Sequence, residues 1–168
     1  MYMMQKSFAV LALAGLVFAS SARADEVIRH KIPGSDFPIS LAIEIPPGST
    51  VVNLSGAVPA VIDPKADPNS VAAFGDTQAQ VVSVLKRIEG TLKSLNLGMS
   101  DVIKMQVFLV KDPALGKVDL AGLMKGYKQF FGTPEQPNLP TRSAFEIAGL
   151  ANPGWLVEIE VSAVRPKK

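Results

Sequence analysis

The chain has 168 residues, 48% of them hydrophobic, which is enough for one domain with a sizeable core. Cysteine is absent, which excludes disulfides, a thiol nucleophile and any metal site built on cysteine. The formal net charge is +2, with 17 basic and 15 acidic residues, so no large basic excess marks the chain as a nucleic-acid-binding protein.

The first 24 residues are typical of a secretory signal peptide. Lys6 precedes an uncharged apolar run over 7–19, and Ala22-Arg23-Ala24 has the small-x-small pattern of a cleavage site. The run is short for a membrane span, which favours cleavage after Ala24 over an uncleaved anchor helix. Cleavage removes Lys6 and Arg23, so the mature chain has equal numbers of acidic and basic residues. We therefore expect an exported protein, periplasmic if the source is Gram-negative, that binds neither nucleic acid nor membrane.

The start of the mature chain predicts an arm followed by a β-hairpin. Residues 25–38 contain prolines and a glycine, which predicts an irregular, loosely packed arm. Apolar residues alternate over 39–45, which predicts a strand, and the short apolar run 51–54 predicts a second. The turn residues Pro46-Pro47-Gly48 between them favour a hairpin.

Two helices and a strand are predicted in the middle of the chain. Asn69-Ser70 has the chemistry of a helix cap, and the apolar residues that follow recur at spacings of three and four as far as Gly98. Alternation over 101–110 predicts a strand with its aliphatic odd-numbered residues on one face. A second apolar stripe predicts a helix over 118–131.

The C-terminal part predicts two antiparallel strands around the turn residues of the loop Gly149–Gly154. Odd-numbered apolar residues over 155–163 form one face of the second strand, while Glu158 and Glu160 lie on the other. The order β-β-α-β-α-β-β predicts an α+β domain over 39–168, with both helices on one face of a single sheet. The other face has mixed residues and is either solvated or covered by another subunit.

Two charged residues on these strands are candidates for chemistry. Arg142 precedes a strand that must be largely buried, and a buried guanidinium needs an anionic partner. That partner is either a carboxylate of the chain, from Glu146, Glu158 or Glu160, or the carboxylate of a ligand. Glu158 has two interpretations as well, as an ion-pair partner or as a residue that holds a water molecule.

Other kinds of catalytic site lack their signatures in this sequence. His30 is the single histidine, and we interpret it as a solvated surface residue because no cysteine or acidic cluster offers further metal ligands. A glycine-rich phosphate loop and a Gly-x-Ser-x-Gly motif are both absent from the sequence. We therefore expect no metal site.

Three motifs resemble those of the Rid/YjgF family, also called L-PSP or endoribonuclease-like. The C-terminal motif is Pro140-Thr141-Arg142-Ser143, followed after a gap by Val157-Glu158-Ile159-Glu160-Val161. The run Asn53-Leu54-Ser55-Gly56-Ala57-Val58-Pro59 resembles the family's Ser-Gly element, and residues 97–109 resemble its Gly…Asp-Val-x-Lys element. The resemblance covers about residues 43–164, and it implies a chorismate-mutase-like fold.

The resemblance also implies an assembly and an activity. Members form homotrimers with ligand clefts between subunits, and they hydrolyse 2-imino or enamine acids to 2-oxo acids and ammonia without a metal or cofactor. Arg142 matches the arginine that binds the substrate carboxylate, and Glu158 matches the glutamate beside the attacking water. Ser55 and Gly56 match the element that lines the same pocket, and Ala144 matches a position with main-chain ligand contacts.

Two positions differ from the family pattern and leave a second function open. Phe37-Pro38-Ile39 stands where active members have a tyrosine after Gly-Pro, and Ala144 stands where a cysteine is common. The cleft therefore suits either an imine deaminase or a non-catalytic trimer that binds a small carboxylate or 2-oxo acid. The balanced charge of the mature chain argues against ribonuclease activity.

Overall fold

The computed structural model describes residues 26–165, so the predicted signal peptide over 1–24 lies outside the described residues. The strands are β1 (Ile28–Lys31), β2 (Ser40–Glu44), β3 (Thr50–Asn53), β4 (Val102–Val110), β5 (Thr141–Ile147) and β6 (Val157–Arg165). The helices are α1 (Thr77–Ser94) and α2 (Leu120–Tyr127), and 3-10 turns cover Val71–Ala73 and Met99–Asp101. Within 26–165, no helix is long and apolar enough to cross a bilayer.

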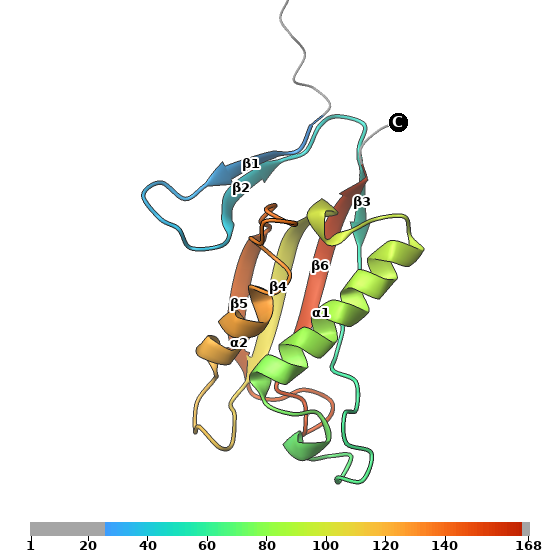
Figure 1. Ribbon diagram of the computed structural model, residues 1–168, viewed down its shortest axis with the longest axis vertical. Helices are drawn as coiled ribbons and strands as arrows, with labels where there is room; N and C mark the ends of the chain where they lie inside the picture. The colour runs from blue at the N-terminus through green and yellow to red at the C-terminus, as the bar shows by residue number, and fades with distance from the viewer. Residues whose placement is uncertain (1–25, 166–168) are drawn as a thin grey trace, which may run out of the picture.

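The main sheet has four strands in the order β3-β6-β4-β5. Strands β4 and β5 are parallel, as expected for two strands joined through a helix, and the other neighbours are antiparallel. Helices α1 and α2 both lie over one face of this sheet (Figure 1). The α+β chorismate-mutase-like fold predicted from the sequence is therefore confirmed. The two C-terminal strands do run in opposite directions, but β4 lies between them.

The core confirms the predicted alternation along the two central strands. The buried members are Ile103, Met105, Val107 and Leu109 on β4, with Val157, Ile159, Val161 and Ala163 on β6. Each fully buried aliphatic side chain stabilises the fold by about 1.5–3 kcal/mol. The four buried side chains of β6 therefore determine which face of this strand points towards the core. The residues between them, including Glu158 and Glu160, are therefore directed to the open face.

The N-terminal part differs from the prediction. The expected irregular arm contains β1, which pairs with β2 in a separate two-stranded sheet. Arg29 fastens this sheet to the body, because its guanidinium donates to the carbonyls of Ser100, Val102 and Leu139 at 2.8–3.0 Å. The predicted hairpin between the next two strands is wrong, since β3 pairs with β6 instead. Strand β3 aligns with β6 over Thr50–Asn53, which packs Val52 against the core.

Both helices are shorter than the apolar stripes predicted. Helix α1 begins at Thr77 rather than after Ser70, because Gly75 adopts a φ of 85° and separates the helix from the preceding 3-10 turn. The observed N-cap is Asp76, whose carboxylate accepts the N–H of Ala79 at 2.8 Å. Helix α2 is limited to eight residues, and the residues after Tyr127 continue as turns.

Gln80 is fully buried at the start of α1 and holds the loop that precedes β6. Its amide donates to the carbonyls of Gly75 and Gly154 at 2.9 Å and accepts the N–H of Leu156 at 2.8 Å. Gln80→Leu leaves two buried backbone groups, the carbonyl of Gly154 and the N–H of Leu156, without partners, together with the part-buried carbonyl of Gly75. Each buried group costs about 1–3 kcal/mol. We expect the free energy of unfolding to fall by about 3 kcal/mol or more.

Urea unfolding followed by circular dichroism measures this effect. The control is Gln129→Leu, because Gln129 is exposed, and its replacement should change the free energy of unfolding by less than about 0.5 kcal/mol. Equal stability of the Gln80→Leu variant and the parent would show that the buried amide does not hold the loop.

Candidate functional site

Arg142 lies near the start of β5, in register with the buried Met105 of β4. Neighbouring residues in register share a face, so Arg142 is directed to the helix-covered side of the sheet. Its guanidinium carbon lies 4.5 Å from the ring centroid of Tyr127 and 5.5 Å from that of Phe37. Atom Nη2 donates to the sulfur of Met124 at 3.3 Å, whereas the buried Nη1 has no hydrogen-bond partner. The guanidinium is thus held by aromatic rings rather than by an anion.

Arg142 has no ion-pair partner among residues 26–165. Burial lowers the pKa of Arg142, and Tyr127 acts in the opposite direction. Burial also raises the pKa of Tyr127, so its phenol stays protonated and donates to the carbonyl of Pro38 at 2.8 Å. Within residues 26–165 the carboxylates in contact with a basic side chain are those of Glu44, which contacts His30, and Glu89, which pairs with Lys93. The alternative in which Arg142 pairs with a carboxylate of its own chain is therefore wrong.

Ser55 and Gly56 form a bulge at the end of β3. Asn53 pairs with Ser162, and Ala57 pairs with Ile159. Residues 54–56 therefore lie opposite only residues 160 and 161 of β6, so the first segment has one extra residue. Such bulges are enriched beside functional sites, because they change the direction of nearby groups. The predicted pocket element is therefore an irregular backbone segment at the edge of the sheet.

Glu158 lies next to this bulge. A Cβ on Gly56 would overlap the carboxylate of Glu158, so the side chain covers the glycine and a larger residue does not fit there. Glu158 is in register with Phe108, whose ring stacks on that of Phe145 with centroids 5.9 Å apart. The carboxylate therefore lies between a backbone bulge and an aromatic pair on the open face.

The structure brings some of the predicted site residues together and keeps others apart. Glu158 lies against Gly56 of the bulge. Arg142 and Ala144 are on β5, where Arg142 faces the helices and Ala144 is exposed in register with Val107. Since Glu158 faces the open side, one chain does not place its carboxylate and the Arg142 guanidinium in one site.

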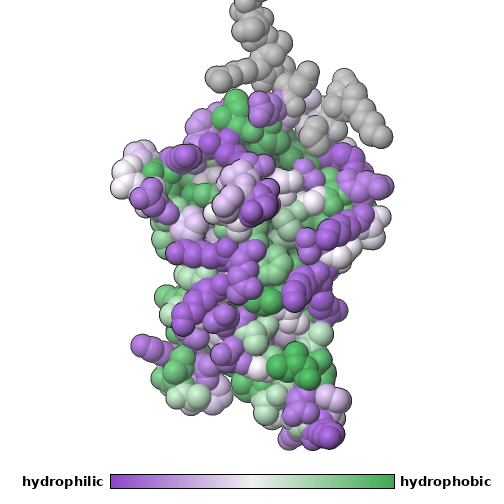
Figure 2. Space-filling view, in the orientation of Figure 1, coloured by the Kyte–Doolittle hydropathy of each residue, from purple (hydrophilic) through white to green (hydrophobic). Residues whose placement is uncertain are grey.

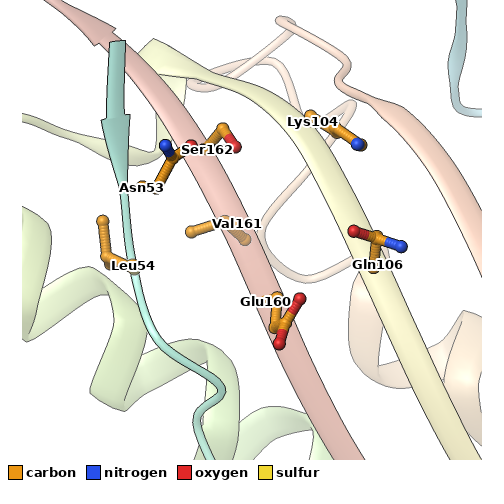
Figure 3. Close-up of a pocket in the computed structure, with 7 residues that line it drawn as sticks. All are labelled: Asn53, Leu54, Lys104, Gln106, Glu160, Val161 and Ser162. Carbon is orange, nitrogen blue, oxygen red and sulfur yellow. Dashed lines mark hydrogen bonds between the residues drawn. The ribbon is translucent and has the colours of Figure 1, made fainter.

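The open face is polar beyond Glu158. A cavity of about 200 Å³ is lined there by Asn53, Lys104, Gln106, Glu160 and Ser162 among others (Figure 3). The hydroxyl of Ser162 donates to the side-chain oxygen of Asn53 at 2.7 Å. The mixed character predicted for this face is confirmed. The helix side also has a mixed surface, with hydrophilic side chains among exposed hydrophobic ones (Figure 2).

Two residues beside Arg142 were missed by the sequence analysis. Tyr127 was assigned to an apolar helix stripe, and Phe37 was assigned to the arm. Neither spacing nor composition relates either residue to Arg142, because the contacts form only when α2 and the β1–β2 loop pack against β5. His30 is exposed, as predicted, and its ring Nε2 forms a hydrogen bond with the exposed Glu44 at 2.7 Å. In the part of the chain that the structure describes, no group of three potential metal ligands occurs.

The strand order, the bulge and the two charged strand residues define an α+β domain of the chorismate-mutase-like type. The chain belongs to the Rid/YjgF/L-PSP family, whose model, described as Endoribonuclease L-PSP, matches residues 38–165. A RutC family protein from Haemophilus influenzae is 30% identical over 136 residues, which are 81% of this chain and 93% of that one.

Solved structures agree with this assignment. The crystal structure of E. coli TdcF with bound serine is 31% identical, covers 79% of this chain and 92% of its own, and has a TM-score of 0.54. A member of the conserved Rid protein family from Yersinia pestis, YyfB, has a TM-score of 0.60 at 22% identity, over 83% of this chain and 98% of its own. The resemblance seen in the sequence is therefore confirmed at the level of family and fold.

Proposed function

We propose that this protein hydrolyses small 2-imino or enamine acids to 2-oxo acids and ammonia, in a cleft completed by a second copy of the chain within a homotrimer. The observation that carries the proposal is Arg142, a guanidinium held by two aromatic rings with a buried Nη1 that lacks a partner. A guanidinium binds a planar carboxylate through two parallel hydrogen bonds and so orients the rest of the substrate.

Glu158 supplies the second group that the reaction requires. Its carboxylate accepts a proton from a water molecule, and the oxygen of that water forms a bond to the imine carbon. Glu158 then returns the proton to the nitrogen of the tetrahedral adduct, and the carbon–nitrogen bond breaks and releases ammonia. The hydroxyl loses its proton as the C–O bond becomes the carbonyl of the 2-oxo acid. A protonated imine is already electrophilic, so one carboxylate beside the water molecule is sufficient for the attack on the imine carbon.

The position of the two residues supports a site shared between copies. Arg142 and Glu158 face opposite sides of the same sheet, so one small molecule reaches both only if they come from different subunits. The open face of each chain also exposes Phe145 by 43%, beside Phe108 and Glu158. A second copy packed on this face would bury the aromatic pair and exclude water from the carboxylate.

A non-catalytic function is the second candidate. Ile39 stands where the resemblance places a tyrosine, and Tyr127 uses its hydroxyl on the carbonyl of Pro38. The relative TdcF was crystallised with bound serine, which supports a site for small molecules that carry a carboxylate. In this candidate, the same cleft retains a small carboxylate or 2-oxo acid without turnover.

The test is a deaminase assay on the exported protein, whose mass should place its first residue at Asp25. An amino-acid oxidase generates 2-imino acids in the cuvette, and semicarbazide traps whatever imine remains. We expect the protein to reduce the rate of semicarbazone formation, whereas heat-inactivated protein should not. An unchanged rate for a range of imines, with a trimeric and folded protein, would leave only the binding function.

A further inference from the structure

A second cavity lies between the Ser55–Gly56 bulge and α1. Its volume is about 380 Å³, which lies in the range of small-molecule sites, roughly 300–1,000 Å³. The cavity of Figure 3 falls below that range. The lining combines the bulge with apolar side chains, among them Leu54, Ile88 and Leu95. A ligand here would touch the pocket element already assigned to the site.

Arg87 is the one charged residue that lines this cavity. Its Nη1 donates to the carbonyl of Val58 at 2.6 Å, which holds the guanidinium close to the bulge. The remaining N–H groups of the Arg87 guanidinium form no hydrogen bond within residues 26–165. The nearest acidic residue along the helix, Glu89, is paired with Lys93 at 3.0 Å. The cavity therefore offers a free cation beside an apolar wall, with no carboxylate to compete.

We infer that Arg87 binds the distal carboxylate of the substrate, so that the preferred substrates are 2-imino dicarboxylic acids. The inference rests on the proposed function, in which Arg142 of a second copy holds the α-carboxylate at the same bulge. The apolar wall then suits the methylene groups between the two carboxylates. Two guanidiniums at the ends of one cleft favour a dianion over a neutral chain of equal length.

The experiment compares two ligands that differ in the distal group. Calorimetry measures the binding of 2-oxoglutarate and 2-oxohexanoate, and the trapping assay measures kcat/KM for the imines of glutamate and norleucine. We expect the diacid to be preferred at least tenfold, and Arg87→Gln to remove that preference while changing the monoacid values less than twofold. Lys86→Gln, on an exposed neighbour outside the lining, should change neither.

The outcomes separate this inference from the proposed function. Arg87-dependent binding of 2-oxoglutarate without hydrolysis of any imine would support the inference and refute catalysis. Hydrolysis with equal kcat/KM for both imines would refute the inference and leave catalysis in place. An Arg87→Gln variant that weakens both ligands equally would also overturn it, since Arg87 would then only support the bulge through Val58.

Discussion

Glu158→Gln is expected to remove turnover and to leave binding intact. Glutamine keeps the size of the side chain over Gly56 but does not accept a proton from water. General-base catalysis contributes roughly 10²–10⁴-fold to a rate, so kcat for imine hydrolysis should fall by about that factor. The dissociation constant of a 2-oxo acid should change less than about threefold, because the carboxylate-binding group is Arg142. Trapping assays and calorimetry on the same preparation measure the two quantities.

Glu160→Gln is the matched control for this variant. Glu160 lies two residues further along β6, on the same open face, and lines the polar cavity instead of the bulge (Figure 3). Its replacement should leave kcat within about twofold of the parent. Equal losses in the two variants would point to a general effect of charge on the open face. A Glu158→Gln variant with full activity would remove Glu158 from the mechanism.

Periodicity in the sequence was sufficient to predict the central strands and the layer of helices. The aliphatic odd-numbered residues of β4 and β6 are all buried, and this alternation is what directs Glu158 to the open face. The local pattern was enough to predict which face of each strand is buried, because the alternation of apolar side chains along the strand determines that face. The Ser55–Gly56 element and Glu158 were expected in one pocket, and the bulge places Gly56 against the Glu158 carboxylate.

The predictions that were wrong concern contacts between segments that are far apart in the sequence, or backbone turns that residue types alone do not reveal. The strand 39–45 was predicted correctly, but its partner was not, because β6 offers β3 a longer edge that also buries part of Val52. The helix start was misplaced because a cap residue such as Ser70 does not reveal the left-handed turn at Gly75 that follows. Tyr127 could not be linked to Arg142 from sequence, since helix and strand meet only in the packed domain.

Arg142→Met is expected to separate ligand binding from stability. A hydrogen bond to a charged group is worth about 1.5–3 kcal/mol, so the affinity for a 2-oxo acid should fall by about 10- to 150-fold. Stability should stay within about 1 kcal/mol of the parent, because methionine packs against Tyr127 and Phe37 and a desolvated cation disappears. Calorimetry and thermal unfolding provide the two measurements.

Arg142→Lys tests whether ligand binding depends on the two parallel donors of the guanidinium or only on its positive charge. Lysine keeps the cation but presents a single ammonium in place of two parallel donors, and it loses planar stacking on Tyr127. We expect binding between that of the parent and that of Arg142→Met, with kcat lowered because the imine carbon is no longer aligned with Glu158. If Arg142→Met bound the 2-oxo acid as well as the parent and melted several degrees lower, the guanidinium would be a structural cation held by Tyr127 and Phe37. The unpaired Nη1 would then be a cost of the fold, and the cleft would have to bind its ligand through other groups.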